Sequence, residues 1–468
     1  MSRDAAIAGA QVYFDDGGFL ADLKRRVAIP SESQRPERRP ILQTYFDEAA
    51  IPQLRDLGFA TRTVDGPEGS GPFLIGERHE GDGLPTVLIY GHGDVVRGYE
   101  GKWRDNLSPW EVTVVGDRWY GRGTADNKGQ HAINLAALAP VMAARGGRLG
   151  FNVKLILEMG EEIGSPGLRE VCARHKAELK ADVLIASDGP RMSAARPTVF
   201  LGSRGAFNFD LVLKLRDGGH HSGNWGGALR NPATILAAAI ASMVDANGKI
   251  LVEGLRPQPI PAAVRAAIAD LKVGGNPGDP EVDADWGEPG LTTEERVYGW
   301  NTLEVLAMLA GNPDLPVNAI PPEARATLQL RYVVGCDPDT FIPAISAHLA
   351  ERGFGGIVAT ASRVAFAATR LDPENPWVTW ALASIARTSG KKPALLPNLG
   401  GSLPNDAFAD VLGLPTIWVP HSYPACSQHA PDEHLLGSVA REALGIMAGL
   451  YWDLGEDGKA LIAAGKAS

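Results

Sequence analysis

The sequence predicts an α/β protein with two domains, the smaller inserted into the larger. At 468 residues the chain is too long for one ordinary hydrophobic core. Roughly the first 200 residues alternate between helix-like and buried-strand-like patterns. Near Arg204 the strands become half-exposed, and from Trp377 the earlier alternating pattern resumes. We therefore expect a large domain from residues 1–202 and 367–468, with a mixed, mostly parallel sheet flanked by helices. Residues 203–366 are expected to form the inserted α+β domain.

Buried strands and helices alternate in the first part of the large domain. Residues 86–90 form a short, continuous apolar run, which is typical of a strand buried on both faces. Pro30 and Gly58 mark helix ends, and Pro140 inside a helical pattern predicts a kink. The expected helices cover 19–27, 41–57 and 130–144, and the expected strands cover 86–90, 151–157 and 181–186.

The inserted domain has another pattern, because its strands alternate apolar and polar residues and are therefore covered on one face only. A Gly/Pro-rich, acidic stretch at 274–290 predicts a long loop. The expected strands cover 206–214, 324–334 and 357–364, and the expected helices cover 231–244 and 338–352. The large domain resumes with a helix from Trp377, a strand at 416–419 and a closing helix with an apolar stripe at Val439, Ala443, Ile446, Met447 and Leu450.

Composition argues against several classes of protein. Mean hydropathy is -0.08, and no apolar run approaches the roughly 20 residues needed to cross a bilayer. A net charge of -10 without any Lys/Arg cluster argues against nucleic acid as a partner. No signal peptide is visible, and Cys172, Cys336 and Cys426 lack C-x-x-C spacing, so a reducing cytosol is expected. Any metal is then held by His, Asp and Glu, which favours zinc, manganese or cobalt.

Two adjacent carboxylates, Glu161 and Glu162, follow the predicted strand at 151–157. Such a pair is costly to hold together unless a cation neutralises one of the two. The other is then free to move protons, which is the division of labour that metal-assisted hydrolysis requires. On a solvated loop, the same pair would be no more than a polar surface.

Further candidate ligands follow other predicted strands, whose carboxyl ends meet at one edge of an open α/β sheet. His92 and Asp94 are two residues apart and share a face, so His92 can bind a metal while Asp94 orients the groups around it. Taken singly, each candidate is usually a solvated or hydrogen-bonded structural residue. The remaining candidates are Asp126 in a Gly-rich turn, Asp188 after the strand at 181–186, and His429 in a loop before the last helix.

Eight motifs in order give the chain a resemblance to the M20 family of metallopeptidases, and most of all to its carnosinase-type branch. The motifs are H-x-D-V-V, G-R-G-x-x-D-x-K-G, G-E-E-x-G-S, S-D-G, H-S-G-x-x-G-G, the I-P-P segment leading to Arg331, G-G-S-L-P and H-A-P-x-E. Any one of them is weak evidence, whereas the ordered set is specific. The resemblance implies that the inserted domain is a ferredoxin-like lid through which two subunits form a homodimer.

The same resemblance implies a site for two divalent metal ions. His92 and Asp188 would hold one ion, Glu162 and His429 the other, and Asp126 would bridge them. A water between two cations loses its proton near neutral pH, and Glu161 would serve as the general base that accepts it. In the family the peptide bond after the bridging aspartate is often cis, which here is the bond between Asp126 and Asn127.

The resemblance also implies residues that contact the substrate. His221 would donate to the developing oxyanion, often in the partner subunit's site, although a turn histidine beside glycines is the alternative. Asn318 and Arg331 match positions that hold the substrate, and a guanidinium forks onto both oxygens of a terminal carboxylate. A solvent-facing strand arginine is the rival interpretation. Ser402 resembles a substrate-contacting residue and is no nucleophile, because the chain lacks a G-x-S-x-G elbow.

Three functions are compatible with these residues. The first is hydrolysis of an amide bond in a small carboxylate-bearing substrate, such as a dipeptide or an N-acyl amino acid. The second is a non-catalytic binding protein of the same fold, which a missing ligand or base would favour, and none is missing. The third is hydrolysis of an aryl amide or ester, which Trp225, Trp300 and Trp418 near the substrate segments would serve.

Overall fold

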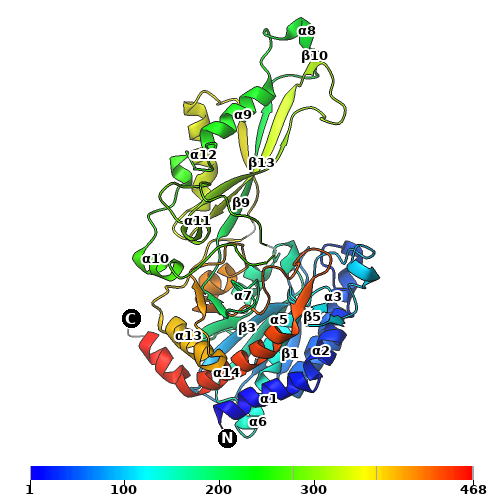
Figure 1. The fold of residues 1–468 in the computed structure, drawn as a ribbon, viewed down its shortest axis with the longest axis vertical. Helices are drawn as coiled ribbons and strands as arrows, with labels where there is room; N and C mark the ends of the chain where they lie inside the picture. The colour runs from blue at the N-terminus through cyan, green and yellow to red at the C-terminus, as the bar shows by residue number, and fades with distance from the viewer. Residues whose placement is uncertain (1, 278, 365, 466–468) are drawn as a thin grey trace.

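The computed structural model describes residues 2–277, 279–364 and 366–465. The chain forms a large domain and an inserted domain that extends from its top (Figure 1). The described residues begin and end in the large domain, and the N-terminal end lies opposite the insertion. The chain leaves the large domain after strand β8 (Thr198–Phe200) and returns to it at helix α13 (Pro376–Ser389).

A mixed eight-stranded sheet forms the centre of the large domain, in the order β1-β2-β6-β3-β7-β16-β8-β15. Four neighbouring strands at its middle, β6, β3, β7 and β16, run parallel, whereas β1 and β2 pair antiparallel at one side. Besides β8, the strands are β1 (Ala60–Asp65), β2 (Pro72–Arg78), β3 (Thr86–His92), β6 (Asn152–Glu158), β7 (Val183–Ala186), β15 (Ala394–Leu396) and β16 (Thr416–Trp418). The predicted mixed sheet is confirmed.

Helices cover both faces of this sheet. Alternate residues of β3 face opposite sides, so that Val87 and Ile89 join one core and Leu88 and Tyr90 the other. The first core contains α1 (Arg3–Asp15), α2 (Gly18–Val27), α3 (Arg39–Tyr45), η2 (Phe46–Ala50), α4 (Ile51–Asp56), α5 (Lys128–Ala136), α6 (Leu138–Ala144), α13 and α14 (Gly437–Gly465). The second contains α7 (Leu168–Arg174) and η7 (Ala407–Leu412). The predicted break near Pro140 lies at Ala137, between α5 and α6.

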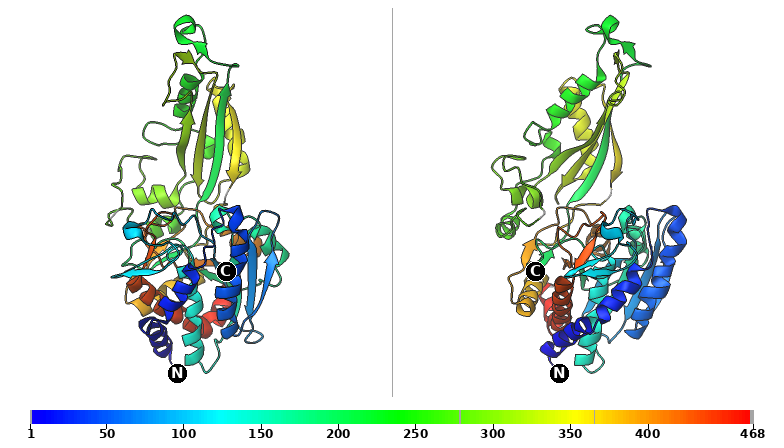
Figure 2. Two further views of the ribbon diagram at one scale, coloured as in Figure 1. Left: turned by 90° about the vertical axis from the view of Figure 1, so that its right-hand side faces the viewer. Right: turned by 45° about the vertical axis from the view of Figure 1, so that its right-hand side comes forward.

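The inserted domain contains a four-stranded antiparallel sheet in the order β11-β13-β9-β14. Helices α9 and α12 pack on one face of it, as Figure 2 shows. The chain order β9 (Gly205–Lys214), α9 (Pro232–Met243), β11 (Thr302–Leu309), β13 (Glu323–Tyr332), α12 (Phe341–Glu351) and β14 (Val358–Val364) is that of a ferredoxin-like fold. The side chain of Asn231 caps α9 by accepting from the Ala233 amide, and Pro232 fits the first turn.

The described residues also form several smaller elements. The tip of the inserted domain contains β10 (His220–His221), α8 (Ser222–Trp225) and β12 (Ala319–Ile320). Helices α10 (Ala262–Ile268) and α11 (Thr293–Gly299) lie near its base, and the described residues between them form the predicted long loop. A small sheet in the large domain joins β17 (His434–Leu436), β5 (Arg118–Tyr120) and β4 (Thr113–Val115). Among the described helices, none has the length and apolar character that crossing a bilayer requires.

Candidate metal centre

Three adjacent parallel strands bring most of the predicted ligands to one edge of the sheet. Strands β6, β3 and β7 are neighbours, and their carboxyl ends point the same way. His92 is the last residue of β3, and Asp188 lies two residues beyond β7. A single turn, η4 (Glu161–Ile163), follows β6 and carries the acidic pair. Sequence order alone could not show that these three strands are neighbours.

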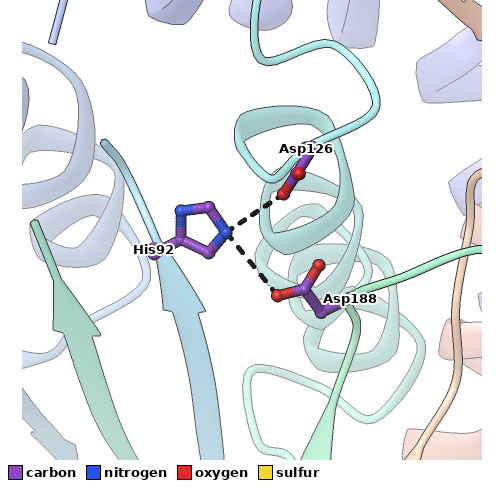
Figure 3. A group of neighbouring side chains, drawn as sticks. All are labelled: His92, Asp126 and Asp188. Atoms are coloured by element: carbon purple, nitrogen blue, oxygen red, sulfur yellow. Dashed lines mark hydrogen bonds and ion pairs between the residues drawn. The ribbon is translucent and has the colours of Figure 1, made fainter. Parts of the chain in front are cut away.

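The first group of potential ligands contains His92, Asp126 and Asp188, all of them buried (Figure 3). His92 Nε2 lies 3.1 Å from Asp126 Oδ1 and 3.6 Å from Asp188 Oδ2. Its Nδ1 lies 3.1 Å from the backbone oxygen of Asp94. With Nδ1 donating to that oxygen, Nε2 is turned toward the two carboxylates, as a metal ligand needs.

The second group contains Asp126, Glu162 and His429. His429 Nε2 lies 2.9 Å from Asp126 Oδ2 and 3.1 Å from Glu162 Oε2. Asp126 thus offers one carboxylate oxygen to each group, and the potential ligand atoms of each group lie within 4.8 Å of one another. The peptide bond between Asp126 and Asn127 is cis, as the resemblance predicts.

Burial and the closeness of like charges shift the pKa values of these groups. Burial raises the pKa of Glu162 to about 7, and the Asp126 charge adds to that effect. Burial also raises the pKa of Glu161 well above its ordinary value, with the nearby carboxylates of Asp188 and Glu162 contributing. Hydrogen bonds to Asp126 and Glu162 raise the pKa of His429 to about 11. The pocket therefore favours added positive charge, whether from protons or from cations.

The donor set fits divalent cations. His and carboxylate ligands without a thiolate suit zinc, manganese or cobalt. Glu162 Oε1 is buried and has no hydrogen-bond partner in the described part of the chain, which is costly for a carboxylate oxygen unless a ligand meets it. The shared carboxylate of Asp126 matches the arrangement needed to join two ions.

Asp94 belongs to neither ligand group but contacts the turn that carries the two glutamates. Its Oδ1 accepts the Glu161 amide at 3.2 Å, and its Oδ2 accepts the Glu162 amide at 3.2 Å. The buried carboxylate of Asp94 therefore fixes the turn that carries both glutamates. Gly93 is required beside it, since a Cβ there would meet the Tyr45 ring at 2.3 Å.

Glu433 is fully buried behind the loop that carries Asp126, here called the Asp126 loop. It forms an ion pair with Arg122, whose Nη1 lies 2.7 Å from Glu433 Oε2. Its carboxylate also accepts three backbone amides, from Gly123 at 3.0 Å, Ala125 at 2.9 Å and Asp126 at 3.0 Å. Because Glu433 and His429 lie in one loop, this contact joins the segments that carry two candidate ligands.

Arg331 and Ser402 lie together near the metal centre. Arg331 Nη1 donates to Ser402 Oγ at 2.8 Å. Ser402 lines a cavity of about 320 Å³ together with ligands from both groups and Glu161. Arg331 on β13 thus contacts the loop that lines this cavity.

His221 and Asn318 lie elsewhere. They lie next to each other, because the Ser222 amide donates to the Asn318 backbone oxygen at 2.8 Å. This pair is exposed at the tip of the inserted domain, far from the sheet edge that carries the metal centre (Figure 1). Within one chain, the structure does not bring His221 to the ligands.

Gln428 is a site residue that the sequence did not indicate. Its Nε2 donates to Asp126 Oδ2 at 2.5 Å, and it lines the same cavity as His429. The sequence feature that could have indicated Gln428 is its position directly before His429. A glutamine beside a loop histidine is otherwise common on surfaces, so this signal is weak.

Comparisons with known proteins agree with the resemblance. Residues 88–452 match the model of peptidase family M20/M25/M40. The chain is 35% identical over 257 residues to the mouse (Mus musculus) protein "Beta-Ala-His dipeptidase", over 52% of this chain and 51% of the relative. It is 30% identical over 314 residues to "Cysteinylglycine-S-conjugate dipeptidase" from Corynebacterium striatum, over 63% of this chain and 65% of the relative. The matched region therefore spans about half to two-thirds of these relatives.

Solved structures share the whole fold at lower identity. Human carnosine dipeptidase 1 superposes with a TM-score of 0.77 at 23% identity, over 97% of this chain and 99% of that one. The M20 family metallo-carboxypeptidase Sso-CP2 from Sulfolobus solfataricus gives 0.79 at 24% identity, over 94% and 99%. The di-peptidase Dug1p from Saccharomyces cerevisiae gives 0.79 at 20% identity, over 97% and 99%. These likenesses establish the two-domain fold.

Proposed function

Because this chain belongs to peptidase family M20/M25/M40, we propose that it is a metal-dependent hydrolase of amide bonds in small carboxylate-bearing substrates. Dipeptides and N-acyl amino acids are the substrates that fit best. The observation that carries this proposal is the pair of ligand groups sharing Asp126, with Glu161 beside them in the same cavity. The named dipeptidases among its relatives point the same way.

Each ligand group would hold one divalent ion. His92 and Asp188 would hold the first, Glu162 and His429 the second, and Asp126 would contribute to both. Zinc is the first candidate, with manganese and cobalt as alternatives. Bound ions of this kind make a water molecule more acidic and stabilise negative charge at the reacting carbonyl.

Glu161 is the proton carrier in this proposal. Its carboxylate lines the cavity, and its Oε2 lies 4.0 Å from His92 Nε2, close to the ligands without belonging to either group. Asp94 holds its backbone in place. Glu161 accepts a proton from the attacking water and delivers it to the departing amine.

Arg331 and Ser402 would bind the substrate's terminal carboxylate. Burial lowers the pKa of Arg331, and no carboxylate is paired with it among the described residues. Its guanidinium therefore remains available for an anionic group beside the metal centre. Ser402, which lines the cavity, accepts a hydrogen bond from it.

A homodimer would supply His221 and Asn318 from the partner subunit. Their distance from the metal centre of their own chain supports this arrangement. The edge strand β11 exposes Val305, Leu306, Met308 and Leu309 on the inserted domain, as a strand buried between subunits does. His221 would then donate a hydrogen bond to the oxyanion that forms on the substrate. We place this dimer in a reducing cytosol, on the ground of the three scattered cysteines.

Within one chain, none of the three tryptophans that favoured the aryl amide alternative lines the cavity at the metal centre. Trp418 is fully buried, and its ring stacks on Phe200 in the core of the large domain. Trp225 is exposed at the tip, and Trp300 lines a cavity within the inserted domain. Neither ring lines the cavity at the metal centre.

The test compares metal-loaded enzyme, chelated enzyme and the Glu161→Gln variant on dipeptides, N-acyl amino acids and aryl amides. We expect chelation to abolish hydrolysis and added zinc, manganese or cobalt to restore it. Glu161→Gln should keep two ions per chain and lose at least about a hundredfold in kcat, because only the proton acceptor is removed. Exposed Glu170 on α7 gives a matched control, Glu170→Gln, with normal rates. Full activity after chelation, or in Glu161→Gln, would refute the proposal.

A further inference from the structure

Helix α5 carries a row of buried side-chain amides directly after the Asp126 loop. Asn127 precedes the first residue of the helix, and Gln130 and Asn134 follow at helical spacing, so the three share one face. All three side chains are fully buried. A buried amide is costly unless it is hydrogen-bonded, so the partners of these groups indicate which segments the helix face holds.

Asn127 connects the loop of Asp188 to strand β3. Its Nδ2 donates to the backbone oxygen of Ser187, directly before Asp188, at 2.8 Å. Its Oδ1 accepts the backbone amide of His92 at 3.4 Å. One side chain thus contacts the segments that carry two ligands of the first group, and its own backbone follows the third, Asp126.

The amide of Asn127 has a defined orientation because His131 donates to its oxygen. Tyr45 Oη accepts from Arg26 Nη1 at 2.9 Å and lies 2.7 Å from His131 Nε2, so the hydroxyl donates its own proton to Nε2. Burial lowers the pKa of His131 well below its ordinary value, and the Arg26 charge adds to this effect, so the neutral ring carries its one proton on Nδ1. Nδ1 lies 3.2 Å from Asn127 Oδ1, which leaves the Nδ2 of Asn127 for Ser187.

Gln130 connects the loops of Asp126 and Asp188 through the opposite neighbour of each ligand. Its Nε2 donates to the backbone oxygens of Ala125 at 2.8 Å and Gly189 at 3.2 Å. Ala125 precedes Asp126, and Gly189 follows Asp188. The residues on both sides of Asp188 therefore accept from amides of the same helix face.

These contacts oppose a repulsion within the first group. The potential ligand atoms of His92, Asp126 and Asp188 lie within 4.8 Å of one another, so two buried carboxylates face each other. A lysine or arginine between them would relieve the repulsion but would compete with a metal ion for both carboxylates. Amides hold the two loops through backbone oxygens and add no charge.

We propose that Asn127 and Gln130 are positioning residues that set the affinity of the first ligand group for its ion. This inference rests on the proposed function, in which each group holds one ion. Among the described residues, neither amide has a hydrogen bond to Glu162 or His429. Asp126 contributes to both groups, but its backbone amide is held from another loop. The second ion should therefore depend on α5 much less than the first.

The test titrates the metal-free protein with zinc or cobalt and resolves the affinity of each ion by calorimetry. Gln130→Met keeps the size of the side chain and removes its hydrogen bonds. It should weaken one ion by about 10- to 100-fold, as is usual when a group that orients a ligand is lost, and leave the other nearly unchanged. In His429→Ala, which removes a ligand of the second group only, the remaining ion should be the one that Gln130→Met weakens.

Asn152→Leu is the matched control. Asn152 is buried at the amino end of β6, and its amide also holds backbone groups, accepting from Glu80 at 2.7 Å and donating to Gly81 at 3.1 Å. This variant should lose stability in urea unfolding of the metal-free protein and still bind both ions as the wild type does. Should Gln130→Met fail to fold, Asn127→Ala takes its place with the same expected result.

Unchanged affinity for both ions in Gln130→Met, with or without a loss of stability, would show that the amide serves only the packing of α5. An equal loss at both ions would show that it shapes the whole centre rather than the first group. Either result overturns the inference and leaves the proposed function standing, whereas a wild-type protein that binds no divalent ion overturns both.

Discussion

Single carboxylates in this molecule differ in function because their surroundings differ. Asp94 accepts two backbone amides and holds a turn, whereas Glu161 lies in the same cluster but faces the cavity. Glu158, at the end of β6, is fully buried and accepts hydroxyl hydrogen bonds from Tyr90 at 2.8 Å and Ser165 at 2.9 Å. Residue type alone could not separate these roles; burial and the identity of the donors do.

Glu158 makes the stability of the protein depend on pH. Burial raises its pKa to about 7, and the Asp94 charge contributes. Because the folded protein holds this proton more tightly than the unfolded chain does, its contribution is complete below about pH 4.5 and is lost as the pH rises through about 7. The loss is at most about 3 kcal/mol at the usual 1.36 kcal/mol for each pKa unit.

Urea unfolding of the wild type and Glu158→Gln between pH 5 and pH 8 checks this prediction. The glutamine keeps an acceptor for both hydroxyl groups and does not titrate. The variant should therefore lose less stability than the wild type over that range. Parallel curves for the two proteins would contradict the assignment.

Among the elements, the Asp126 loop depends on a distant segment for its shape. Strands β5 and β17 pair antiparallel, so the loops that precede and follow them are held side by side. Glu433 adds the contact that matters most, because its carboxylate accepts the backbone amides of Asp126, the proposed bridging ligand, and of Ala125 before it. We expect this contact to govern metal affinity more than folding.

Replacing Glu433 with glutamine tests that expectation. The amide group would turn a donor toward backbone donors, so the Asp126 loop should shift. Metal affinity should fall by about 10- to 100-fold, as is usual when a group that orients a ligand is lost. Glu442→Gln is the control, since Glu442 lies on α14, pairs with Arg191 and Lys391, and has no hydrogen bond or ion pair to the Asp126 loop among the described residues. A variant that is less stable when metal-free but binds metal as the wild type does would show a merely structural role.

At this scale the sequence predicted some elements well and others poorly. Continuous apolar strands such as β3 and the stripe of α14 were predicted, because burial on a regular period leaves a clear pattern. Strand β1 was not, since its side chains are mostly exposed and carry little pattern. The candidate ligand set came from motifs, whereas Gln428 was missed because its importance comes from its contact with Asp126, which is distant in sequence.

At the scale of the whole molecule, the feature that bears most on function is the separation between the tip of the inserted domain and the metal centre of the large domain. Strand β10, which carries His221, lies at the tip of the inserted domain in Figure 1, away from the large domain that carries the candidate ligands, so one chain alone would lack the proposed oxyanion donor. A rigid inserted domain that exchanges its tip with a second copy would complete both sites at once. The exposed β11 edge offers the surface for such an exchange.

Mixing two inactive variants tests whether the sites are shared. Glu161→Gln lacks the proton acceptor, and His221→Ala lacks the proposed donor. In a mixed dimer, the Glu161 of one chain meets the His221 of the other, so one of the two sites is intact. Random exchange makes half of the dimers mixed, and activity should return to about a quarter of the wild-type value. Differently tagged subunits confirm that exchange has occurred. If mixed dimers form and stay inactive, His221 serves its own chain, and the inserted domain must bend until its tip reaches the metal centre.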